Sequence, residues 1–298
     1  MKKIIAIIIL IGIAFSLGAC GNKQDSETKT DYVIEEAEDV FPEYEMMYFI
    51  PQLPGNMQRA AARIYKGLMS YERSIDLSGY SLDTQEVSVV HQLLQCECSE
   101  LFHVDFLKVG LDLFKENNKV YLYKPGYLIK EEDYPGALKT LYEKTEEILN
   151  GFEETGASGD IKKFGFVVNC LANTLNVEDT EFTGTNSVYE ALVLGKAKCD
   201  GVAHTVQYLM QKLGVQTLFI SGKNKPADIG HAWNAVKLEG KWCEIDVTGA
   251  LKTGDLEYFL GSKGSELEEI LEPSGIYSSL VKLPDFDNPV QMNFDIEE

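Results

Sequence analysis

The fold follows from one stretch of the chain, GHAWNAVKLEGKWCEIDVT at residues 230–248. Apolar and polar side chains alternate along its two halves, as they do in half-buried strands. Glu239-Gly240 separates the halves and suits a two-residue hairpin turn. The stretch therefore predicts an antiparallel hairpin of strands 231–238 and 241–248.

The register of this hairpin brings two reactive side chains together. If Leu238 faces Lys241, Asp246 lies opposite Trp233, on the same face as His231 and diagonal to it. Diagonal neighbours have Cα atoms about 7–8 Å apart, which allows a hydrogen bond between their side chains. This face is the more polar one, and the opposite face is expected to pack in the core. The expected core positions there are Ala232, Val236, Leu238, Cys243, Ile245 and Val247.

A third reactive side chain, Cys199, stands where a glycine-containing loop enters a predicted helix that ends at Gly214. A thiol at this point lies at the positive end of the helix dipole, which favours the thiolate. The backbone N–H groups at the same helix end can also stabilise an oxyanion. Cys170, in contrast, falls within an apolar helix predicted over residues 161–175 and is expected to be a core residue.

The remaining histidines lack such partners. His204 follows Cys199 by five residues, about one and a half helical turns, and so points well away from the thiol. His91 and His103 lie in the N-terminal region without a recognisable partner. All three are therefore expected to be structural or surface residues.

Three motifs between Ser187 and Thr248 resemble the bacterial transglutaminase-like superfamily, which shares the papain-like order Cys, His, Asp. The motifs are CDGVA at 199–203, GHAWN at 230–234 and WCEIDVT at 242–248. The resemblance extends more weakly to residues 161–186 and 258–260. Two positions depart from the family pattern and could reshape a substrate groove. They are Val202, in place of an aromatic residue, and Gly249, where the family often has Trp.

The resemblance implies an α+β fold with a papain-like core, in which the helix bearing the cysteine packs on an antiparallel sheet. It implies that Cys199 is the nucleophile, that His231 is its base and that Asp246 orients His231. The candidates for the substrate groove are Tyr189, Asp200 and Trp233. No cofactor is implied, and no metal is expected because the sequence has no Asp-x-Asp-x-Asp-Gly calcium loop.

The implied activity is that of a thiol enzyme that attacks amide bonds of protein or peptide substrates and forms a thioester. The superfamily includes transferases, peptidases and amidases, so the acceptor of the acyl group, an amine or water, stays open. A housekeeping peptidase that acts on cell-wall peptides fits the same triad. The alternative from another class is a surface binding or scaffold lipoprotein that retains a vestigial site.

The first nineteen residues have the features of an export signal. Lys2 and Lys3 precede an apolar run whose length, 16 residues from Ile4 to Ala19, is short of the roughly 20 that cross a bilayer. The sequence LGAC at 17–20 resembles the lipobox of bacterial lipoproteins, which implies a diacylated Cys20. An ordinary secretory signal followed by a chance cysteine is the alternative. Two acyl chains would anchor the protein to the extracytoplasmic face of the cell membrane.

Charge and cysteine content exclude several partners and sites. The chain has 27 basic and 47 acidic residues, a net charge of −20, which becomes −22 if cleavage removes Lys2 and Lys3. A charge of this sign disfavours nucleic acid and anionic polymers as partners. Five irregularly spaced cysteines follow Cys20, which is a poor disulfide framework. Cys96 and Cys98 lack the companion ligands of a zinc site.

The chain is expected to divide into five parts. A signal peptide at 1–19 and an acidic flexible tether at 20–45 precede an N-terminal helical and mixed region at 46–134. A transglutaminase-like catalytic domain then occupies 135–270, and a C-terminal extension occupies 271–298. Within the N-terminal region, the short run at 120–123 predicts a strand that Pro125-Gly126 closes.

Overall fold

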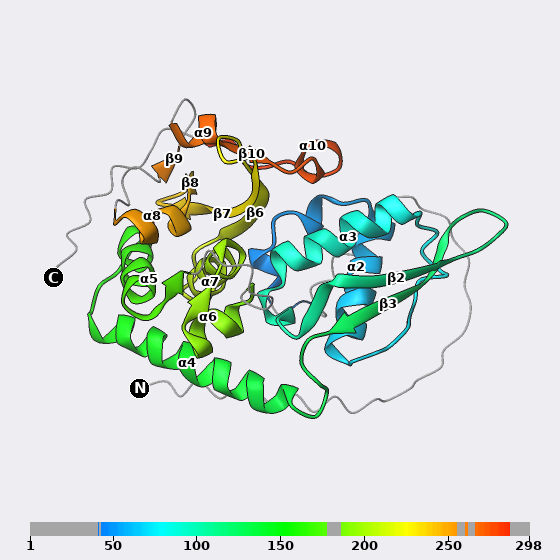
Figure 1. Ribbon diagram of the computed structural model, residues 1–298, viewed down its shortest axis with the longest axis horizontal. Coiled ribbons are helices and arrows are strands. Elements are labelled where there is room, and N and C mark those ends of the chain that lie inside the picture. The colour runs from blue at the N-terminus through cyan, green and yellow to red at the C-terminus, as the bar shows by residue number, and fades with distance from the viewer. Residues whose placement is uncertain (1–40, 42, 178–185, 255–259, 262–265, 287–298) are drawn as a thin grey trace, which may run out of the picture.

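The computed structural model describes residues 41, 43–177, 186–254, 260, 261 and 266–286. The predicted signal peptide, Cys20 and most of the tether therefore lie outside the described residues, as do Tyr258, Phe259 and the end of the C-terminal extension. Figure 1 shows two parts side by side, an N-terminal part in blue and cyan and a C-terminal part in green to orange. Helix α7 (Cys199–Lys212) lies where the two parts meet.

The N-terminal part combines helices with a small antiparallel sheet in the order β1-β3-β2. Its elements are η1 (Tyr44–Met46), η2 (Ile50–Gln52), α2 (Gly55–Met69), β1 (Ile75–Asp76), α3 (Thr84–Glu97), η3 (Ser99–Leu101), β2 (Val104–Leu113) and β3 (Val120–Tyr127). Asp83 is the N-cap of helix α3 and forms a capping box: the Asp83 side chain accepts the Glu86 N–H and the Glu86 carboxylate accepts the Asp83 N–H.

Strand β3 corrects the expectation that Pro125-Gly126 closes a short strand. It continues through both residues to Tyr127 and pairs with β2. β1 pairs with only Leu122 and Tyr123, so Pro125 faces no second strand in the described sheet. A residue without an N–H is tolerated at such an edge.

The C-terminal part has helices around a five-stranded antiparallel sheet in the order β10-β6-β7-β8-β9. Before the sheet come α4 (Tyr134–Glu154), α5 (Asp160–Thr174), β4 (Asn176–Val177), α6 (Val188–Leu194), β5 (Lys196–Ala197) and α7. The rest are β6 (Thr217–Asn224), β7 (Ile229–Leu238), β8 (Lys241–Ile245), α8 (Val247–Thr253), β9 (Leu260–Gly261), α9 (Glu266–Ile270), β10 (Leu271–Pro273) and α10 (Ile276–Ser279). The predicted α+β fold, a cysteine-bearing helix on an antiparallel sheet, is confirmed.

The β7–β8 hairpin has the predicted register, with Leu238 paired to Lys241. Glu239 and Gly240 both have positive φ, 49° and 79°, as a tight two-residue hairpin turn requires. The second strand is shorter than predicted: it ends at Ile245, and Asp246 caps helix α8 instead of continuing to Thr248. The cause is local, because a carboxylate that accepts the N–H three residues on favours a helix start over an extended chain.

The sheet is buried on both faces. Val236, Leu238 and Ile245 pack in one cluster with apolar residues of α5 and α7. Trp233 and Ala235, on the face expected to be polar, pack instead in the cluster of the N-terminal helices α2 and α3. The helices that cover this face are distant from the hairpin in the sequence. Alternation of apolar and polar residues along the hairpin could therefore not predict that the face is buried.

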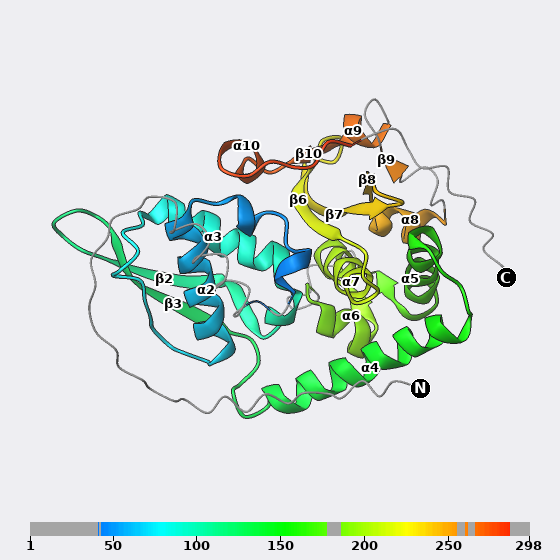
Figure 2. The same ribbon diagram turned by 180° about the vertical axis from the view of Figure 1, so that it is seen from behind.

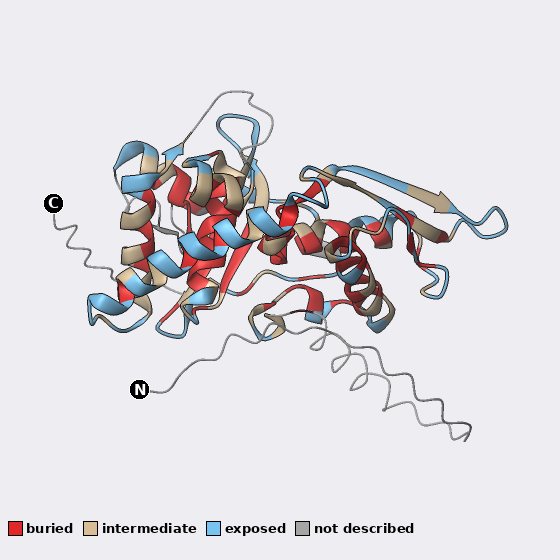
Figure 3. Cartoon of the chain, turned by 90° about the horizontal axis from the view of Figure 1, so that it is seen from below, coloured by how far each residue is buried: buried red, intermediate tan, exposed pale blue. Residues whose placement is uncertain are grey.

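Figure 2 shows the same arrangement from behind, with α4 running along the edge of α5 and α6. Figure 3 shows that the buried residues gather inside the two parts, whereas the β2–β3 hairpin projects with mostly exposed and half-buried residues. Among the described helices, none has the length and apolar character needed to cross a membrane.

Candidate active site

Cys199 is the first residue of helix α7, as predicted. Gly195 ends α6 in the left-handed conformation (φ 66°), and the extended Lys198 then turns the chain into α7. The first N–H groups of a helix have no partner within the helix, so the thiol stands beside these donors and the positive end of the dipole. Val202 and Val206, farther along α7, are fully buried and hold the helix in place.

His231 and Asp246 form a direct hydrogen bond, with Nε2 and Oδ2 2.8 Å apart. The second oxygen of Asp246 accepts the N–H of Gly249 at 3.0 Å, so both oxygens of the carboxylate are held. The two side chains are 12% and 5% exposed, which shields their interaction from water. His231 is thereby fixed in orientation by a carboxylate at the start of α8.

The side chain of Cys199 also acts on this imidazole. Because Nε2 is engaged with Asp246, Nδ1 is the ring nitrogen left for the thiol. Burial lowers the pKa of His231, but its hydrogen bond with Asp246, its interaction with Cys199 and the charges of both residues outweigh this effect and raise the pKa to about 10. The arrangement therefore favours a protonated imidazole beside Cys199.

Asp200 brings a second carboxylate to the thiol. Its Oδ1 lies 3.9 Å from the Cys199 sulfur. Burial raises the pKa of Asp200, while the charge of His231 and the contact with Cys199 act in the opposite direction. Asp200 also lines a pocket.

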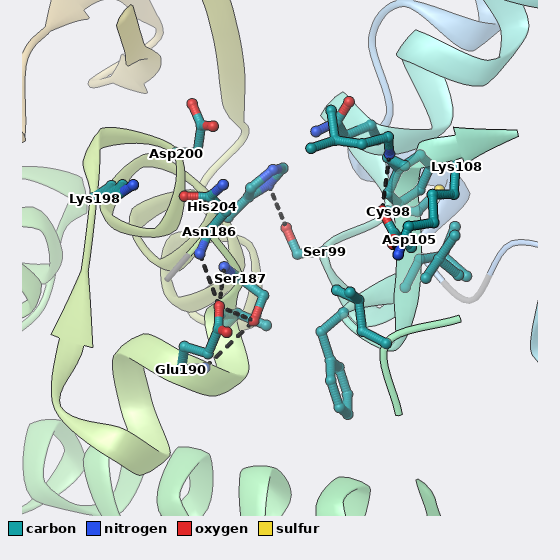
Figure 4. A pocket seen from close by; sticks show the side chains of 18 residues that line it. Cys98, Ser99, Asp105, Lys108, Asn186, Ser187, Glu190, Lys198, Asp200 and His204 are labelled. Atoms are coloured by element: carbon teal, nitrogen blue, oxygen red, sulfur yellow. Dashed lines mark hydrogen bonds and ion pairs between the residues drawn. The ribbon is translucent and has the colours of Figure 1, made fainter. Parts of the chain in front are cut away.

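This pocket lies between the two parts of the molecule and has a volume of about 700 Å³. Figure 4 shows its two walls: Asn186, Ser187, Glu190, Lys198, Asp200 and His204 on one side, and Cys98, Asp105 and Lys108 on the other, with Ser99 between them. Neither Cys199 nor His231 lines the pocket, so it adjoins the thiol without enclosing it. Sequence reasoning missed the N-terminal wall, because no motif in residues 95–128 signals it.

Two other groove candidates occupy different environments. Trp233 is 1% exposed and donates its indole N–H to Glu244 at 2.7 Å. It is a buried support of the sheet, so the expectation that it lines the groove is wrong. Tyr189 stacks on Phe102, with ring centroids 5.3 Å apart, and is absent from the pocket lining, although Phe102 is part of it.

The three remaining histidines have structural surroundings. His204 stacks on Phe219 with ring centroids 4.1 Å apart, and burial lowers its pKa to about 4, although its ring reaches the pocket wall. His91 contacts the hydroxyl of Tyr123 at 2.7 Å. His103 is fully buried and its Nε2 contacts the carbonyl of Leu68 at 3.1 Å.

All five cysteines of the described chain are free. Cys243 is buried, as predicted, but Cys170 is only partly buried on α5, so its assignment to the core is wrong. Cys96 packs with Ala203 of α7 in a small cluster that Cys199 also contacts, which brings the N-terminal helix α3 behind the thiol. The described residues contain no group of three or more His, Cys, Asp or Glu side chains arranged for a metal ion.

The sequence model of the transglutaminase-like superfamily matches residues 153–247. A search of curated proteins finds no match. Among solved structures, the chain is similar to the crystal structure of a TGase, with 17% identity and a TM-score of 0.35, over 66% of this chain and 54% of that one. It is also similar to a candidate cysteine protease from Cytophaga hutchinsonii, with 10% identity and a TM-score of 0.30, over 47% of this chain and 61% of that one. The chain thus spans little more than half the length of either structure.

Proposed function

We propose that this protein, whose residues 153–247 match the transglutaminase-like superfamily, is a thiol enzyme that acts on amide bonds of protein or peptide substrates. In this proposal Cys199 is the nucleophile, His231 is the acid and base, and Asp246 orients His231. The observation that carries it is one imidazole, that of His231, which hydrogen-bonds with Asp246 and whose pKa is also raised by Cys199.

The chemistry follows from these contacts. The thiol proton passes to His231, and the thiolate sulfur attacks the carbonyl carbon of the amide. The negative charge then moves to the carbonyl oxygen, and the backbone N–H groups at the start of α7 are available to stabilise it. His231 returns the proton to the leaving nitrogen as the carbon–nitrogen bond breaks. The products of this half-reaction are an amine or ammonia and a thioester on Cys199.

The second half-reaction transfers the acyl group from Cys199 to an amine or to water, and His231 takes the proton of the acceptor. A peptide library incubated with and without an added primary amine distinguishes the two outcomes by mass spectrometry. A mass increase that requires the amine identifies acyl transfer. Cleavage or deamidation that does not need the amine identifies hydrolysis.

The central test is the rate of Cys199 alkylation by iodoacetamide as a function of pH, followed by peptide mapping. Cys199 is expected to react at about pH 6, where an ordinary thiol is almost entirely protonated. His231→Ala should remove this reactivity because it deletes the proton acceptor. Labelling of Cys199 that begins only in the range of a free thiol, or that is the same in His231→Ala, contradicts the proposal and favours a scaffold with a vestigial site.

Surface anchoring is a separate proposal that rests on residues 17–20 of the sequence. Diacylation of Cys20 would hold the enzyme on the extracytoplasmic face of the membrane. Cys20→Ala should abolish the lipid mass and release the protein from the membrane fraction. A wild-type protein without lipid, together with a membrane-bound Cys20→Ala variant, contradicts this anchoring.

A further inference from the structure

We propose that the pocket beside Cys199 binds a bulky apolar side chain of an extended peptide substrate, next to the amide that reacts. This inference rests on the proposed function and names its substrate class. The selecting wall comes from the N-terminal part, outside the 153–247 segment that matches the superfamily.

The position of the pocket suits a side chain adjacent to the reacting group. Lys198 and Asp200, the residues on either side of Cys199, both line it, and Asp200 Oδ1 lies 3.9 Å from the sulfur. The thiol itself does not line the pocket. A peptide whose carbonyl carbon meets Cys199 therefore presents a neighbouring side chain, and not the reacting amide, to the pocket.

The N-terminal wall is mainly apolar. Gln95, Cys98, Ser99, Asp105 and Lys108 belong to it, and its six apolar side chains are Leu101, Phe102, Val104, Phe106, Leu107 and Leu128. The charged groups near this wall are already paired, because Lys108 lies 3.0 Å from the Asp105 carboxylate. Across the pocket, the Glu190 carboxylate accepts the N–H groups of Asn186 and Ser187. Lys198 and Asp200, beside Cys199, are the other charged residues of the lining, so the apolar surface is concentrated on the N-terminal wall.

Two leucines at this wall are exposed to a degree that is unusual for their size. Leu107 is 92% exposed and Leu128 is 58% exposed. Large apolar groups gathered at the mouth of a pocket are typical of a binding surface. Burial of these side chains against an apolar group of the substrate would favour its binding.

A local irregularity of β2 presents Leu107 in this way. The pairing of β2 with β3 jumps from Asp105↔Gly126 to Val109↔Pro125, so residues 106–108 have no partner in the ladder. The irregular segment is nevertheless held: the Phe106 carbonyl accepts from His91 at 3.0 Å, and the Leu107 N–H donates to Asp105 at 3.2 Å. Such bulges redirect side chains, and this one directs an apolar residue to the pocket.

The test uses two peptidyl chloromethyl ketones that differ only in one residue, Phe or Asp, next to the reactive ketone. In each case the Cys199 sulfur displaces chloride from the methylene carbon and leaves a thioether. The wild-type protein is expected to react about tenfold faster with the Phe probe. Leu107→Asn and Leu128→Asn should reduce this preference to about twofold or less, because a neutral polar side chain at the wall removes the apolar contact without repelling the Asp probe. The matched control is Leu194→Asn, since Leu194 is also 58% exposed but does not line the pocket.

Iodoacetamide, which has no side chain to select, separates this inference from the proposed function. Its rate with Cys199 should be the same in the wild type and all three variants. Equal rates of the two peptide probes in the wild type, or an unchanged preference in both pocket variants, overturn the inference while leaving the enzyme proposal intact. If Cys199 is unreactive even to iodoacetamide, the proposed function fails. The inference is then decided by equilibrium binding of fluorescent acetyl-peptide amides with Phe or Asp, where equal affinities overturn it.

Discussion

The Oδ2 atom of Asp246 lies 2.8 Å from His231 Nε2, while its Oδ1 atom caps helix α8 through the N–H of Gly249. One side chain thus serves both the orientation of the imidazole and the start of a helix. The two roles can be separated, because capping needs one acceptor oxygen whereas the effect on His231 needs a negative charge.

Replacement of Asp246 by Asn and by Ala separates these roles. In Asp246→Asn the amide oxygen can still cap α8, but the loss of charge should lower the pKa of His231 from about 10 toward its ordinary value of about 6.5. Asp246→Ala should lower this pKa as well and also cost about 1 kcal/mol of unfolding free energy through loss of the cap. Histidine proton NMR titration measures the first effect and urea unfolding the second. An unchanged His231 titration in Asp246→Asn would show that the carboxylate does not act on the imidazole.

The raised pKa of His231 also predicts how stability depends on pH. The folded pKa of about 10 exceeds the ordinary value, so the folded state binds the proton more tightly than the unfolded state. The stabilisation is complete below about pH 6.5 and is lost as the pH rises through about 10. The difference in unfolding free energy between wild type and His231→Ala should therefore shrink over this range, by at most about 1.4 kcal/mol per pH unit. A difference that grows with pH would contradict the assignment.

Gly222 is the strand partner of His231, and the sheet leaves no room there for a larger side chain. A Cβ atom there would lie 2.6 Å from Cη2 of Trp233 and would collide with the carbonyl of Glu272. Gly222→Ala should therefore destabilise the protein by about 1–3 kcal/mol. Gly230→Ala is the control, because a Cβ atom at Gly230 meets nothing within 4 Å and should change stability by less than about 0.5 kcal/mol. Urea unfolding measures the free energy of unfolding of both variants. Equal changes in the two variants would contradict the close packing at Gly222.

Thiol accessibility predicts an order of labelling. Cys199 should react first with iodoacetamide, and Cys170 should follow only at higher pH, because burial raises the pKa of its partly exposed thiol. The buried thiols should stay unlabelled until the protein unfolds; they are Cys96, Cys98 and Cys243. Peptide mapping at increasing reagent times measures the order. Early labelling of Cys243 in the native protein would contradict the packing of the hairpin.

The local elements around the site could be predicted because short-range physics determines them. Glu239-Gly240 allows a tight turn, and the turn sets the register of β7 and β8. The glycine-containing loop before Cys199 likewise places the thiol at a helix start. The motifs then indicated that Cys199, His231 and Asp246 belong together. The end of β8 at Ile245 was missed, because Asp246 caps helix α8 locally, and the alternation of apolar and polar residues along the strand does not reveal such a cap.

Packing between distant segments of the chain determines the features that the sequence did not predict. Whether Trp233 lines a groove or lies in the core depends on the N-terminal helices, which cover that face of the sheet. The pocket depends on contacts such as that between the Ser99 hydroxyl and Gln207, which are 108 residues apart in the chain. Alternation and helical periodicity report only which side of an element is apolar, whereas the partner on that side is set by closure of long loops and by burial across the whole molecule. Local sequence patterns therefore suffice to place the reactive side chains on their helix and strands, whereas the surroundings of these side chains follow from packing between distant segments.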